Sequence, residues 1–586
     1  MRRFFLICSF YAAVTMQQAQ DLPIWMTPDE KAQMPFVNYP YGVAGSREYN
    51  KYFLPPAATN LRNMAEWEEV GGYMVTYTSY KGMVRDIIKH GKKECRMYVV
   101  TDNVNNTIND LNNAGIDTVN VTFLVAPYNS VWIRDYGPNM VYLNRVDSLV
   151  FVDWIYNRPT RTKDDTIPLA LAKNMQIPVF MTTQAPYNLV ATGGNWMSDG
   201  MGTAFSSELI IDENKASGGF GVNHTEAEID SIVKKFMGIH RYIKMETLPY
   251  DGIHHIDMHM KLLDEETLLV GEYPQGISDG PQIEANLQYV LNNFKTGFGT
   301  DWRIFRIPMP DDGGLWPSNG GDYLTYTNAS FINKTIIVPT YNVPEDTTAL
   351  RIWREACPGY NVVGINSTAS IPAGGALHCI THEVGVRDPL LITHQRLRDT
   401  YNTSAPYKVT ANILHRSGIQ SATLYYTTDT NTAYQSMPMS LGPNGLYEAN
   451  IPAQPAGTEV FYYIRAQANS GKQQVRPITA PAGFYNFKVL STASNPDTHT
   501  PVTEVLNPFP NPSKGITCLP VNTASSHPIS IAIYNTLGEK VQTVYEGYTK
   551  PGDNKFFINT LHFTAGVYYI RYKIAESETV KTLLVR

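Results

Sequence analysis

Residues 83–125 read MVRDIIKHGKKECRMYVVTDNVNNTINDLNNAGIDTVNVTFLV. Met83 to His90 and Asn106 to Ala114 have the pattern of helices, whereas Met97 to Val100 and Val119 to Val125 are short β-rich runs. Strands that are separated by single helices are typical of an α/β domain. The stretch therefore predicts alternating strands and helices.

The same alternation extends from about Asn38 to about Arg398. Further strands are predicted at Leu149 to Trp154, Glu208 to Ile211, Thr267 to Val270 and Thr335 to Val338, and further helices at Thr225 to Phe236 and Pro281 to Lys295. Several such units, each with a functional residue at a strand end, would point these side chains into a common centre. We therefore predict an α/β catalytic domain over residues 38–398.

The composition favours an exported protein that is rich in strands. The chain has 586 residues, of which 43% are hydrophobic, so three or four folded units with real cores are expected. Only 17% of the residues are charged, while there are 37 tyrosines and 38 prolines. The net charge of −6 gives no argument for nucleic-acid binding, because the sequence has no strongly basic stretch.

Residues 1–19 have the pattern of a signal peptide. Arg2 and Arg3 precede the apolar run Phe4 to Met16, and Ala19 stands where a small residue could precede cleavage. The alternative is a buried first strand or helix. The run is too short for a membrane span and no later segment reaches that length, so the mature chain is expected to be soluble, without a transmembrane segment.

Two all-β units are predicted after the α/β domain. Over residues 405–489, alternating strands such as Ala422 to Tyr426 and Glu459 to Ile464 are separated by turn signals, which indicates a β-sandwich of Ig-like size. Residues 490–504 form a linker rich in Ser, Thr, Asn and Pro. Residues 505–586 predict a smaller second β-sandwich whose last strand lies at the chain terminus.

Three motifs mark this last unit: the PNPSKG turn at residues 510–515, a Tyr-Asn-x-x-Gly hairpin at 534–538 and the AGVYYIR strand at 565–571. Together they resemble the C-terminal sorting domains of type IX secretion cargo in Bacteroidetes-like bacteria. The resemblance implies the type IX secretion machinery as a partner, export through the periplasm, and a secreted or outer-membrane surface-attached location. The alternative is a carbohydrate-binding or spacer module.

Cys379 is the most informative single residue. If Cys8 is lost with the signal peptide, four scattered cysteines without CxxC spacing remain: Cys95, Cys357, Cys379 and Cys518. This pattern is compatible with one disulfide or with a free, functional thiol. Cys379 follows Gly374 and Gly375, where the backbone could turn and expose the sulfur.

Two further motifs carry polar groups that could act with this cysteine. Trp132-Ile133-Arg134-Asp135 can supply an aromatic face and a carboxylate, or a structural Arg–Asp pair under a core tryptophan. Gly193 to Gly200 lacks the Lys-Ser/Thr of a phosphate loop. Its glycines therefore favour close backbone approach or a tight turn over nucleotide binding.

The motif His254 to His259 allows three interpretations. If it is a strand, His255, Asp257 and His259 share one face. They could then bind a metal, with further ligands from His378, His382 and Glu383. Alternatively, His255 is an acid/base and Asp257 its charge partner, or the histidines are satisfied core residues.

The residue types fit attack on a guanidinium group better than metal-dependent hydrolysis. A cysteine thiol has a pKa near ~8.5 unless positive charge lowers it, and a cationic substrate would supply that charge. The guanidinium carbon is a poor electrophile, so two carboxylates must fix the group and hold it against the sulfur. Asp135 and Asp257 are the expected clamp and Trp132 is the stacking wall. His255 is the expected proton donor to the leaving ammonia.

Four motifs in order carry a resemblance to a known family: Trp132-x-Arg134-Asp135, Gly193-Gly194-Asn195-x-x-x-Asp199-Gly200, His255-x-Asp257 and Leu377-His378-Cys379-x-Thr381-His382-Glu383. They resemble the guanidine-modifying (pentein) superfamily and are most similar to the bacterial, Porphyromonas-type peptidylarginine deiminases, with agmatine deiminases as near relatives. The order of catalytic, Ig-like and sorting domains matches as well. The resemblance implies a five-bladed α/β propeller, a thiouronium intermediate on the cysteine, and neither a metal nor another cofactor.

The resemblance also implies catalytic roles for five residues. The family's catalytic cysteine falls on Cys379 and its histidine on His255. Its guanidinium-binding acids fall on Asp135 and Asp257. Its active-site asparagine falls on Asn328.

Three further residues are implied to bind the substrate. Trp132 matches the family's aromatic beside the substrate. The family's Tyr-Asn-Arg-Pro-Arg segment, whose arginines hold the substrate's C-terminal carboxylate, reads Tyr156-Asn157-Arg158-Pro159-Thr160-Arg161 here. Arg158 matches, whereas the second arginine is displaced by one position, so Arg161 makes the contact only if the loop repositions it. The alternative for both arginines is a solvated surface loop.

These residues predict hydrolytic deimination of arginine in peptides or proteins, at a C-terminal arginine above all, to citrulline and ammonia. Gly137-Pro138 resembles agmatine deiminases more, so the alternative is an agmatine deiminase that produces N-carbamoylputrescine. Agmatine has no carboxylate for Arg158, and an exported protein meets peptides more readily than an internal polyamine precursor. A metallohydrolase and a surface adhesin with an inactive catalytic domain are the remaining alternatives.

Overall fold

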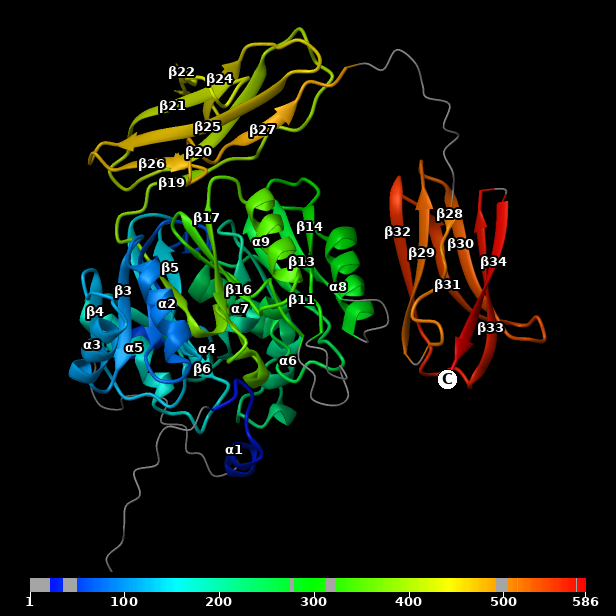
Figure 1. Ribbon diagram of the computed structural model, residues 1–586, viewed down its shortest axis with the longest axis horizontal. Coiled ribbons are helices and arrows are strands. Elements are labelled where there is room, and N and C mark those ends of the chain that lie inside the picture. Colours follow the sequence, from blue (N-terminus) through cyan, green and yellow to red (C-terminus); the bar gives the residue numbers. More distant parts are fainter. Residues whose placement is uncertain are drawn as a thin grey trace, which may run out of the picture.

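The computed structural model describes residues 22–34, 50–273, 279–311, 323–491, 504–513, 515–575 and 577–586. Figure 1 shows three parts, which we call the α/β region (blue to green), the central sandwich (yellow) and the C-terminal sandwich (red). The predicted signal peptide, residues 1–19, and most of the predicted linker, residues 490–504, lie outside the described residues.

Within the described residues, the α/β region contains five sheets that repeat one unit. In each unit a first strand lies antiparallel to a second strand, which pairs in parallel with a third. Four units follow in chain order: β5 (Asn139–Leu143), β6 (Ser148–Tyr156) and β7 (Val179–Thr182); β9 (Met197–Ser198), β10 (Thr203–Ser207) and β11 (Arg241–Met245); β12 (Met260–Asp264), β13 (Thr267–Glu272) and β14 (Arg303–Pro308); β15 (Ser330–Ile332), β16 (Thr335–Thr340) and β17 (Asn361–Asn366).

The fifth unit joins the two ends of the region. Its first strand is the late β18 (His382–Gly385), which pairs with the early β2 (Val70–Thr76). Two parallel neighbours complete its sheet: β3 (Arg96–Thr101) and β4 (Val121–Val125). Short strands extend the β5–β6 sheet: β1 (Arg62–Asn63) and β8 (Val190–Ala191). This pairing brings the cysteine motif next to the start of the region.

Helices connect the parallel strands of the units, as parallel pairing requires. They are α2 (Lys81–Gly91), α3 (Val104–Asn113), α5 (Ile167–Met175), α6 (Leu209–Asn214), α7 (Glu226–Met237), α8 (Asp279–Asn293) and α9 (Glu345–Ala356). The predicted helices correspond to α2, α3, α7 and α8, and most of the predicted strands are also present. The α/β class is therefore confirmed.

The sequence sets the ends of α7 directly. Thr225 accepts a hydrogen bond from the Glu228 amide while the Glu228 side chain accepts from the Thr225 amide, which is a capping box. Gly238 ends the helix with φ 74°, a left-handed conformation that glycine adopts without strain. The buried residues Ile229, Ile232, Val233, Phe236 and Met237 follow helical spacing and pack in a cluster shared by the first and second units.

The predicted strand at Glu208 to Ile211 is wrong, because this segment enters helix α6. The segment begins directly after β10, which already pairs with β11 on one side and with β9 on the other. The side chain of Asn214 donates to the carbonyl of Ile210 at 2.8 Å and also binds the backbone of Val190. These tertiary contacts outweigh the β propensity of an apolar run.

The central sandwich consists of two antiparallel sheets. One contains β19 (Leu391–Thr393), β20 (Tyr407–Leu414), β24 (Tyr447–Ile451) and β23 (Ser440–Leu441). The other contains β22 (Gln435–Pro438), β21 (Ile419–Thr427), β25 (Glu459–Ala468), β26 (Gln473–Arg476) and β27 (Tyr485–Lys488). Their inward side chains form a separate hydrophobic core, as the alternating pattern predicts.

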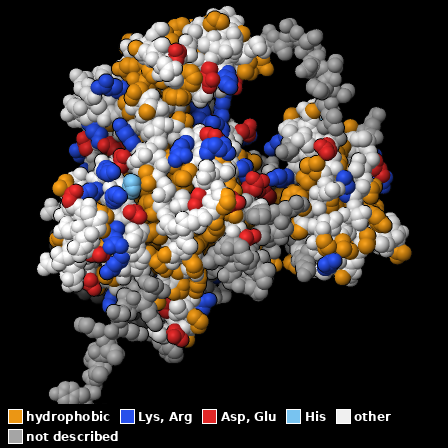
Figure 2. All heavy atoms as spheres, in the orientation of Figure 1, with side chains coloured by type: hydrophobic (Ala, Val, Ile, Leu, Met, Phe, Trp, Pro, Cys, Tyr) orange, Lys and Arg blue, Asp and Glu red, His pale blue; other side chains and the backbone are white. Residues whose placement is uncertain are grey.

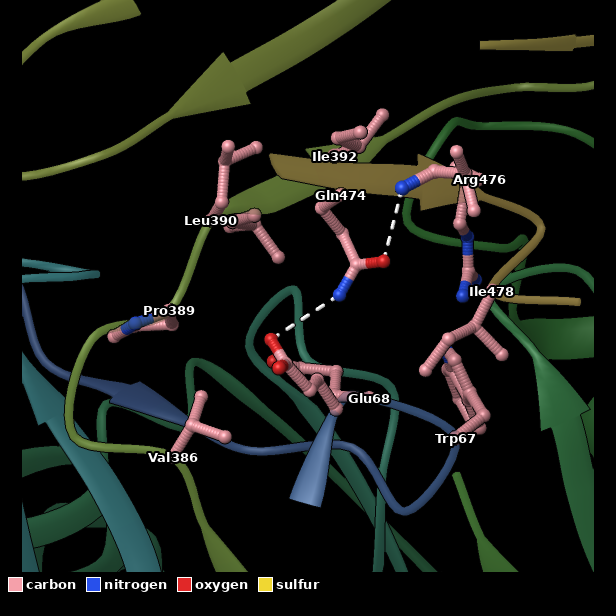
Figure 3. Close-up of a pocket in the computed structure, with 12 residues that line it drawn as sticks. Trp67, Glu68, Val386, Pro389, Leu390, Ile392, Gln474, Arg476 and Ile478 are labelled. Carbon is pink, nitrogen blue, oxygen red and sulfur yellow. Dashed lines mark hydrogen bonds between the residues drawn. The ribbon is translucent and has the colours of Figure 1, made fainter. Parts of the chain in front are cut away.

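Charged pairs join the central sandwich to the α/β region. Arg476 Nη2 lies 2.5 Å from Glu265 Oε2, and Lys472 Nζ lies 2.8 Å from Glu69. Gln474 also donates to Glu69, at 3.1 Å, beside a cavity of about 40 Å³ between the two parts (Figure 3). Figure 2 shows side chains of both charges along this boundary.

The C-terminal sandwich also has two antiparallel sheets. One contains β28 (Glu504–Val505), β29 (Ile516–Thr523) and β32 (Gly552–Asn559), and the other β31 (Lys540–Tyr548), β30 (Pro528–Tyr534), β33 (Gly566–Ile574) and β34 (Ser577–Val585). The predicted hairpin between β30 and β31 is present, and its Asn535 side chain accepts from the amides of Leu537 and Glu539. The predicted terminal strand is β34.

Cys95, Cys357, Cys379 and Cys518 are unpaired thiols. None of the helices among the described residues combines the length and apolar character needed to cross a membrane.

Candidate active site

A short turn precedes the first strand of each of the five units. The turns are α4 (Ile133–Tyr136) before β5, η4 (Gly193–Asn195) before β9, η6 (Ile256–Met258) before β12, residues 327–329 before β15 and η8 (His378–Ile380) before β18. They contact one another in a ring. The Gly194 amide donates to Asp135 Oδ1 at 3.2 Å, and Gly194 also packs against the His255 ring. Thr327 Oγ1 donates to the carbonyl of Asp257 at 3.2 Å, the His378 amide donates to the carbonyl of Asn328 at 3.1 Å, and Arg134 Nε donates to the carbonyl of His378 at 3.3 Å. All five expected catalytic residues lie on or next to these turns.

Cys379 lies in η8 and is fully buried. Its Sγ is 3.2 Å from Asn328 Nδ2, 3.8 Å from Asp257 Oδ2 and 4.0 Å from Met258 Sδ. Burial raises the pKa of the Cys379 thiol well above its usual value, and the charges of Asp257 and Asp135 raise it further. At neutral pH the resting side chain is therefore an uncharged thiol.

Four polar atoms near this sulfur have no hydrogen-bond partner among the described residues: Asp135 Oδ2, Asp257 Oδ1, and both ring nitrogens of His255. The three side chains are at most 1% exposed, and His255 Nδ1 lies 3.6 Å from Asp135 Oδ1. Buried carboxylate oxygens without donors are costly. A guanidinium group has both the positive charge and the several N–H donors that these atoms require.

His378 holds Asp257 in place. Its Nδ1 lies 2.6 Å from Asp257 Oδ2, and its Nε2 lies 2.7 Å from Glu66 Oε1. Lys261 Nζ lies 2.7 Å from the other oxygen of Glu66. Burial opposes ionisation of Asp257, but the hydrogen bond and charge of His378 outweigh it and lower the pKa of Asp257. Because Glu66 and Lys261 belong to no motif, sequence reasoning missed them.

Some of the residues considered as metal ligands make other contacts, whereas the ring nitrogens of His255 and His259 have no hydrogen-bond partner among the described residues. Ile256–Met258 is a 3-10 turn, so His255, Asp257 and His259 do not share a strand face. Glu383 Oε2 pairs with Arg134 Nη1 at 2.8 Å. No group of three or more His, Cys, Asp and Glu side chains in the described part of the chain is arranged to hold a metal ion.

Trp132 lies close to Cys379 and is fully buried. A Cβ atom added to Gly375 would lie 2.7 Å from the Trp132 ring and 2.9 Å from Cys379 Sγ. Only glycine therefore fits between the aromatic ring and the sulfur. The indole Nε1 donates to the carbonyl of Leu22 at 2.8 Å.

Arg158 and Arg161 are buried, with 5% and 1% of their surface exposed, so they do not lie in a solvated loop. Arg158 Nε donates to the carbonyl of Ile24 at 2.7 Å. Arg161 pairs with both oxygens of Glu30, from Nε at 2.8 Å and from Nη2 at 3.0 Å. The two arginines expected to bind a substrate carboxylate thus contact the chain's own N-terminal segment.

Two parts of the chain match known families. Residues 62–384, more than half of the chain, match the family described as "Porphyromonas-type peptidyl-arginine deiminase". Residues 507–586 match the family described as "Secretion system C-terminal sorting domain". The second match confirms the predicted type IX sorting domain and indicates export to a secreted or surface location.

Several relatives and solved structures similar to this chain are described as deiminases. A "Putative agmatine deiminase" of Vibrio parahaemolyticus is 24% identical over 292 residues, which are 45% of this chain and 78% of that protein. A protein of the same name from Legionella pneumophila is 24% identical over 276 residues, which are 45% of this chain and 75% of that protein.

One solved structure shares the fold of the α/β region. A structure described as a "putative agmatine deiminase" is 16% identical, covers 56% of this chain and 96% of its own, and has a TM-score of 0.50. The agmatine deiminase of C. jejuni is 19% identical, covers 56% of this chain and 97% of its own, and has a TM-score of 0.47.

Proposed function

The chain belongs to the Porphyromonas-type peptidyl-arginine deiminase family, and from this premise we propose that it hydrolyses peptidyl arginine, at a C-terminal arginine above all, to citrulline and ammonia. The observation that carries the proposal is the set of unpaired buried atoms of Asp135, Asp257 and His255 around Cys379. A bound guanidinium group would pair with the two carboxylates and lie against the sulfur.

The reaction would begin from the uncharged thiol. A cation bound beside Asp135 and Asp257 offsets the charges that help to raise the pKa of Cys379. The thiol then passes its proton to His255, and the sulfur forms a bond to the guanidinium carbon. Asn328 orients the sulfur from 3.2 Å away.

His255 then acts twice as a proton carrier. It first gives the thiol's proton to the leaving nitrogen, so that a C–N bond breaks, ammonia departs and a thiouronium remains on Cys379. It next takes a proton from water, which attacks the thiouronium carbon. The C–S bond breaks and His255 returns its proton to the sulfur. The extra proton on the new urea group passes to solvent, where it converts the ammonia to ammonium, and citrulline is released.

The sorting domain supports a peptide substrate, because an exported enzyme meets peptides and proteins outside the cell. The alternative is an agmatine deiminase that produces N-carbamoylputrescine. The relatives' names favour this alternative. So do the contacts of Arg158 and Arg161 with the chain's own segment, because agmatine has no carboxylate that needs them.

Product formation from four substrates tests the proposal: a peptide with C-terminal arginine, a peptide with internal arginine, free arginine and agmatine. We expect the highest kcat/KM for the first, no product from a Cys379→Ala variant, and no effect of a metal chelator. A preference for agmatine would replace the proposed substrate by the alternative. Citrulline formation by Cys379→Ala would refute the cysteine mechanism.

We also propose that the five units form a five-bladed α/β propeller around this site. The pairing of β18 with β2 and the ring of contacts among the five turns support a closed arrangement. In this division, residues 38–398 form the catalytic domain, residues 405–489 an Ig-like domain and residues 505–586 the sorting domain.

A further inference from the structure

The N-terminal segment Leu22–Met34 lies across the α/β region. Figure 1 shows its helix α1 (Pro28–Gln33) on the side away from the central sandwich. Ile24 is fully buried, and its amide donates to the carbonyl of Ala373 at 2.9 Å. Met26 and Met34 pack against the small hydrophobic cluster that contains Ile155. The segment is therefore held by backbone and apolar contacts together.

This segment covers the wall of the candidate active site. Leu22 accepts the Trp132 indole hydrogen bond, and a Cβ atom on Gly374 would meet Ile24 and Trp25 within 2.9 Å. The next residue, Gly375, contacts both Trp132 and Cys379. A cavity of about 110 Å³ lies beside these residues, and both Trp25 and Met258 line it. Any approach to Cys379 along this wall would meet the segment.

The polar contacts of the segment are those that a bound peptide would make. Arg158 donates to the carbonyl of Ile24, and Arg161 Nη2 donates to the carbonyls of Pro23 at 2.7 Å and Trp25 at 2.9 Å. Three main-chain carbonyls in a row are thus bound by two buried arginines.

Glu30 adds a carboxylate to these contacts. Its two oxygens accept from Nε and Nη2 of Arg161, the two-pronged geometry in which arginine binds carboxylates most strongly. Thr160 Oγ1 donates to the same carboxylate at 3.1 Å. Burial opposes its ionisation, but the hydrogen bond and charge of Arg161 lower the pKa of Glu30 to about 2.

We propose that Trp132, Arg158, Arg161 and Ala373–Gly374 form a peptide-binding groove, and that residues 22–34 occupy this groove in competition with substrate peptides. Glu30 takes the position of a peptide carboxylate on Arg161. Because the segment is tethered to the α/β region, its effective concentration exceeds that of a free peptide. The segment in the groove therefore weakens the binding of substrate peptides. The effect on substrate rests on the proposed deiminase function, whereas the occupancy of the groove does not.

The test uses the full chain with the recognition site of a specific protease inserted after Met34. The chain is cut after folding and separated from the segment, and alkylation of Cys379 by iodoacetamide is followed by mass spectrometry. We expect Cys379 in the cut protein to react about tenfold faster or more, and a synthetic peptide of residues 22–34 to restore the slow rate. Equal rates in both forms would overturn the proposal.

Substitution of Glu30 isolates the role of its carboxylate. In the uncut chain we expect Glu30→Gln to raise kcat/KM about tenfold for a peptide with C-terminal arginine, and less for the same peptide as an amide. Lys31→Gln is the matched control, because Lys31 is exposed on the same helix turn. A synthetic segment with Glu30→Gln should also protect Cys379 more weakly than the native peptide, and equal protection would refute the carboxylate's role.

The two proposals fail in different ways. Alkylation of Cys379 requires no turnover. If the cut protein is alkylated faster than the uncut protein but deiminates none of the four substrates, the groove proposal stands and the proposed function is refuted. If citrulline forms at the same rate before and after cutting, and Cys379 is alkylated at the same rate in both forms, the groove proposal is refuted and the proposed function stands.

Discussion

Nδ1 of His378 lies 2.6 Å from Oδ2 of Asp257, and both side chains are fully buried. This contact fixes one oxygen of Asp257 and leaves the other, Oδ1, without a partner among the described residues. The carboxylate is therefore held ionised, with its unpaired oxygen available to a guanidinium group.

Replacement of His378 should weaken the reaction through Asp257. We expect His378→Phe to lower kcat/KM roughly 10–150-fold, the effect of about 1.5–3 kcal/mol for a hydrogen bond to a charged group. The pKa of Asp257 rises when His378 no longer lowers it, so the acidic limb of the pH profile should move to higher pH. His378→Asn, which keeps a donor, should lose less. An unmoved acidic limb would show that His378 does not act through Asp257.

Asp135→Asn should separate activity from stability. The Oδ2 atom of Asp135 is buried without a partner among the described residues, so its charge contributes little to folding. We expect kcat/KM to fall by roughly 30-fold or more, while the free energy of unfolding stays equal or rises. Asp86→Asn on the exposed face of α2 is the control and should change neither. A large loss of stability in Asp135→Asn would indicate a structural role instead.

Gly375→Ala should close the site without unfolding the protein. The added methyl group would meet the Trp132 ring at 2.7 Å and Cys379 Sγ at 2.9 Å. We expect a loss of activity by roughly 100-fold or more, since small displacements of the reacting groups are costly. Gly82→Ala, in open space on α2, is the matched control and should stabilise the helix slightly. Full activity in Gly375→Ala would place the guanidinium elsewhere.

The alkylation rate of Cys379 should report its raised pKa. Because burial and two nearby carboxylates disfavour the thiolate, the rate in the substrate-free protein should still be rising at pH 9. The measurement is the iodoacetamide rate at Cys379 between pH 6 and about 10, read by mass spectrometry in one form of the chain. A rate that is already maximal at pH 7 would contradict the uncharged resting thiol.

Arg476→Ala should weaken the junction between the central sandwich and the α/β region. It removes the partner of Glu265, whose side chain is 9% exposed, and so leaves a buried carboxylate unpaired. We expect a loss of about 3 kcal/mol in denaturant unfolding. The double variant with Glu265→Ala should be less affected than the single one. Equal losses in both would show that the unpaired carboxylate of Glu265 is not the source of the loss.

The units of the fold could be predicted because their signals are local. The helix patterns of residues 83–90 and 225–236 each lie within one element, and the structure agrees with them. Helix α6 was missed because Asn214 fixes it through Val190, 24 positions earlier in the chain. No local pattern records such a contact.

The site residues likewise divide into those that could be predicted from local motifs and those that could not. The roles proposed for Cys379, His255 and Asp257 follow from short motifs, and the structure brings these residues together. Glu66 was not predicted because it meets His378 across 312 positions and belongs to no motif. The occupation of Arg161 by Glu30 was missed for the same reason, since the two residues are 131 positions apart.

The five turns that meet around Cys379 all occupy the same place, immediately before the first strand of a unit. The strands and helices of the units pack into shared hydrophobic clusters, whereas each turn adds one or two polar side chains to the centre. The turns therefore occupy equivalent positions, and the polar residues of one turn can be substituted while the packing of its unit is kept. A new guanidine specificity can accordingly be engineered by substitution in one turn at a time, with the strands and helices of the five units left unchanged.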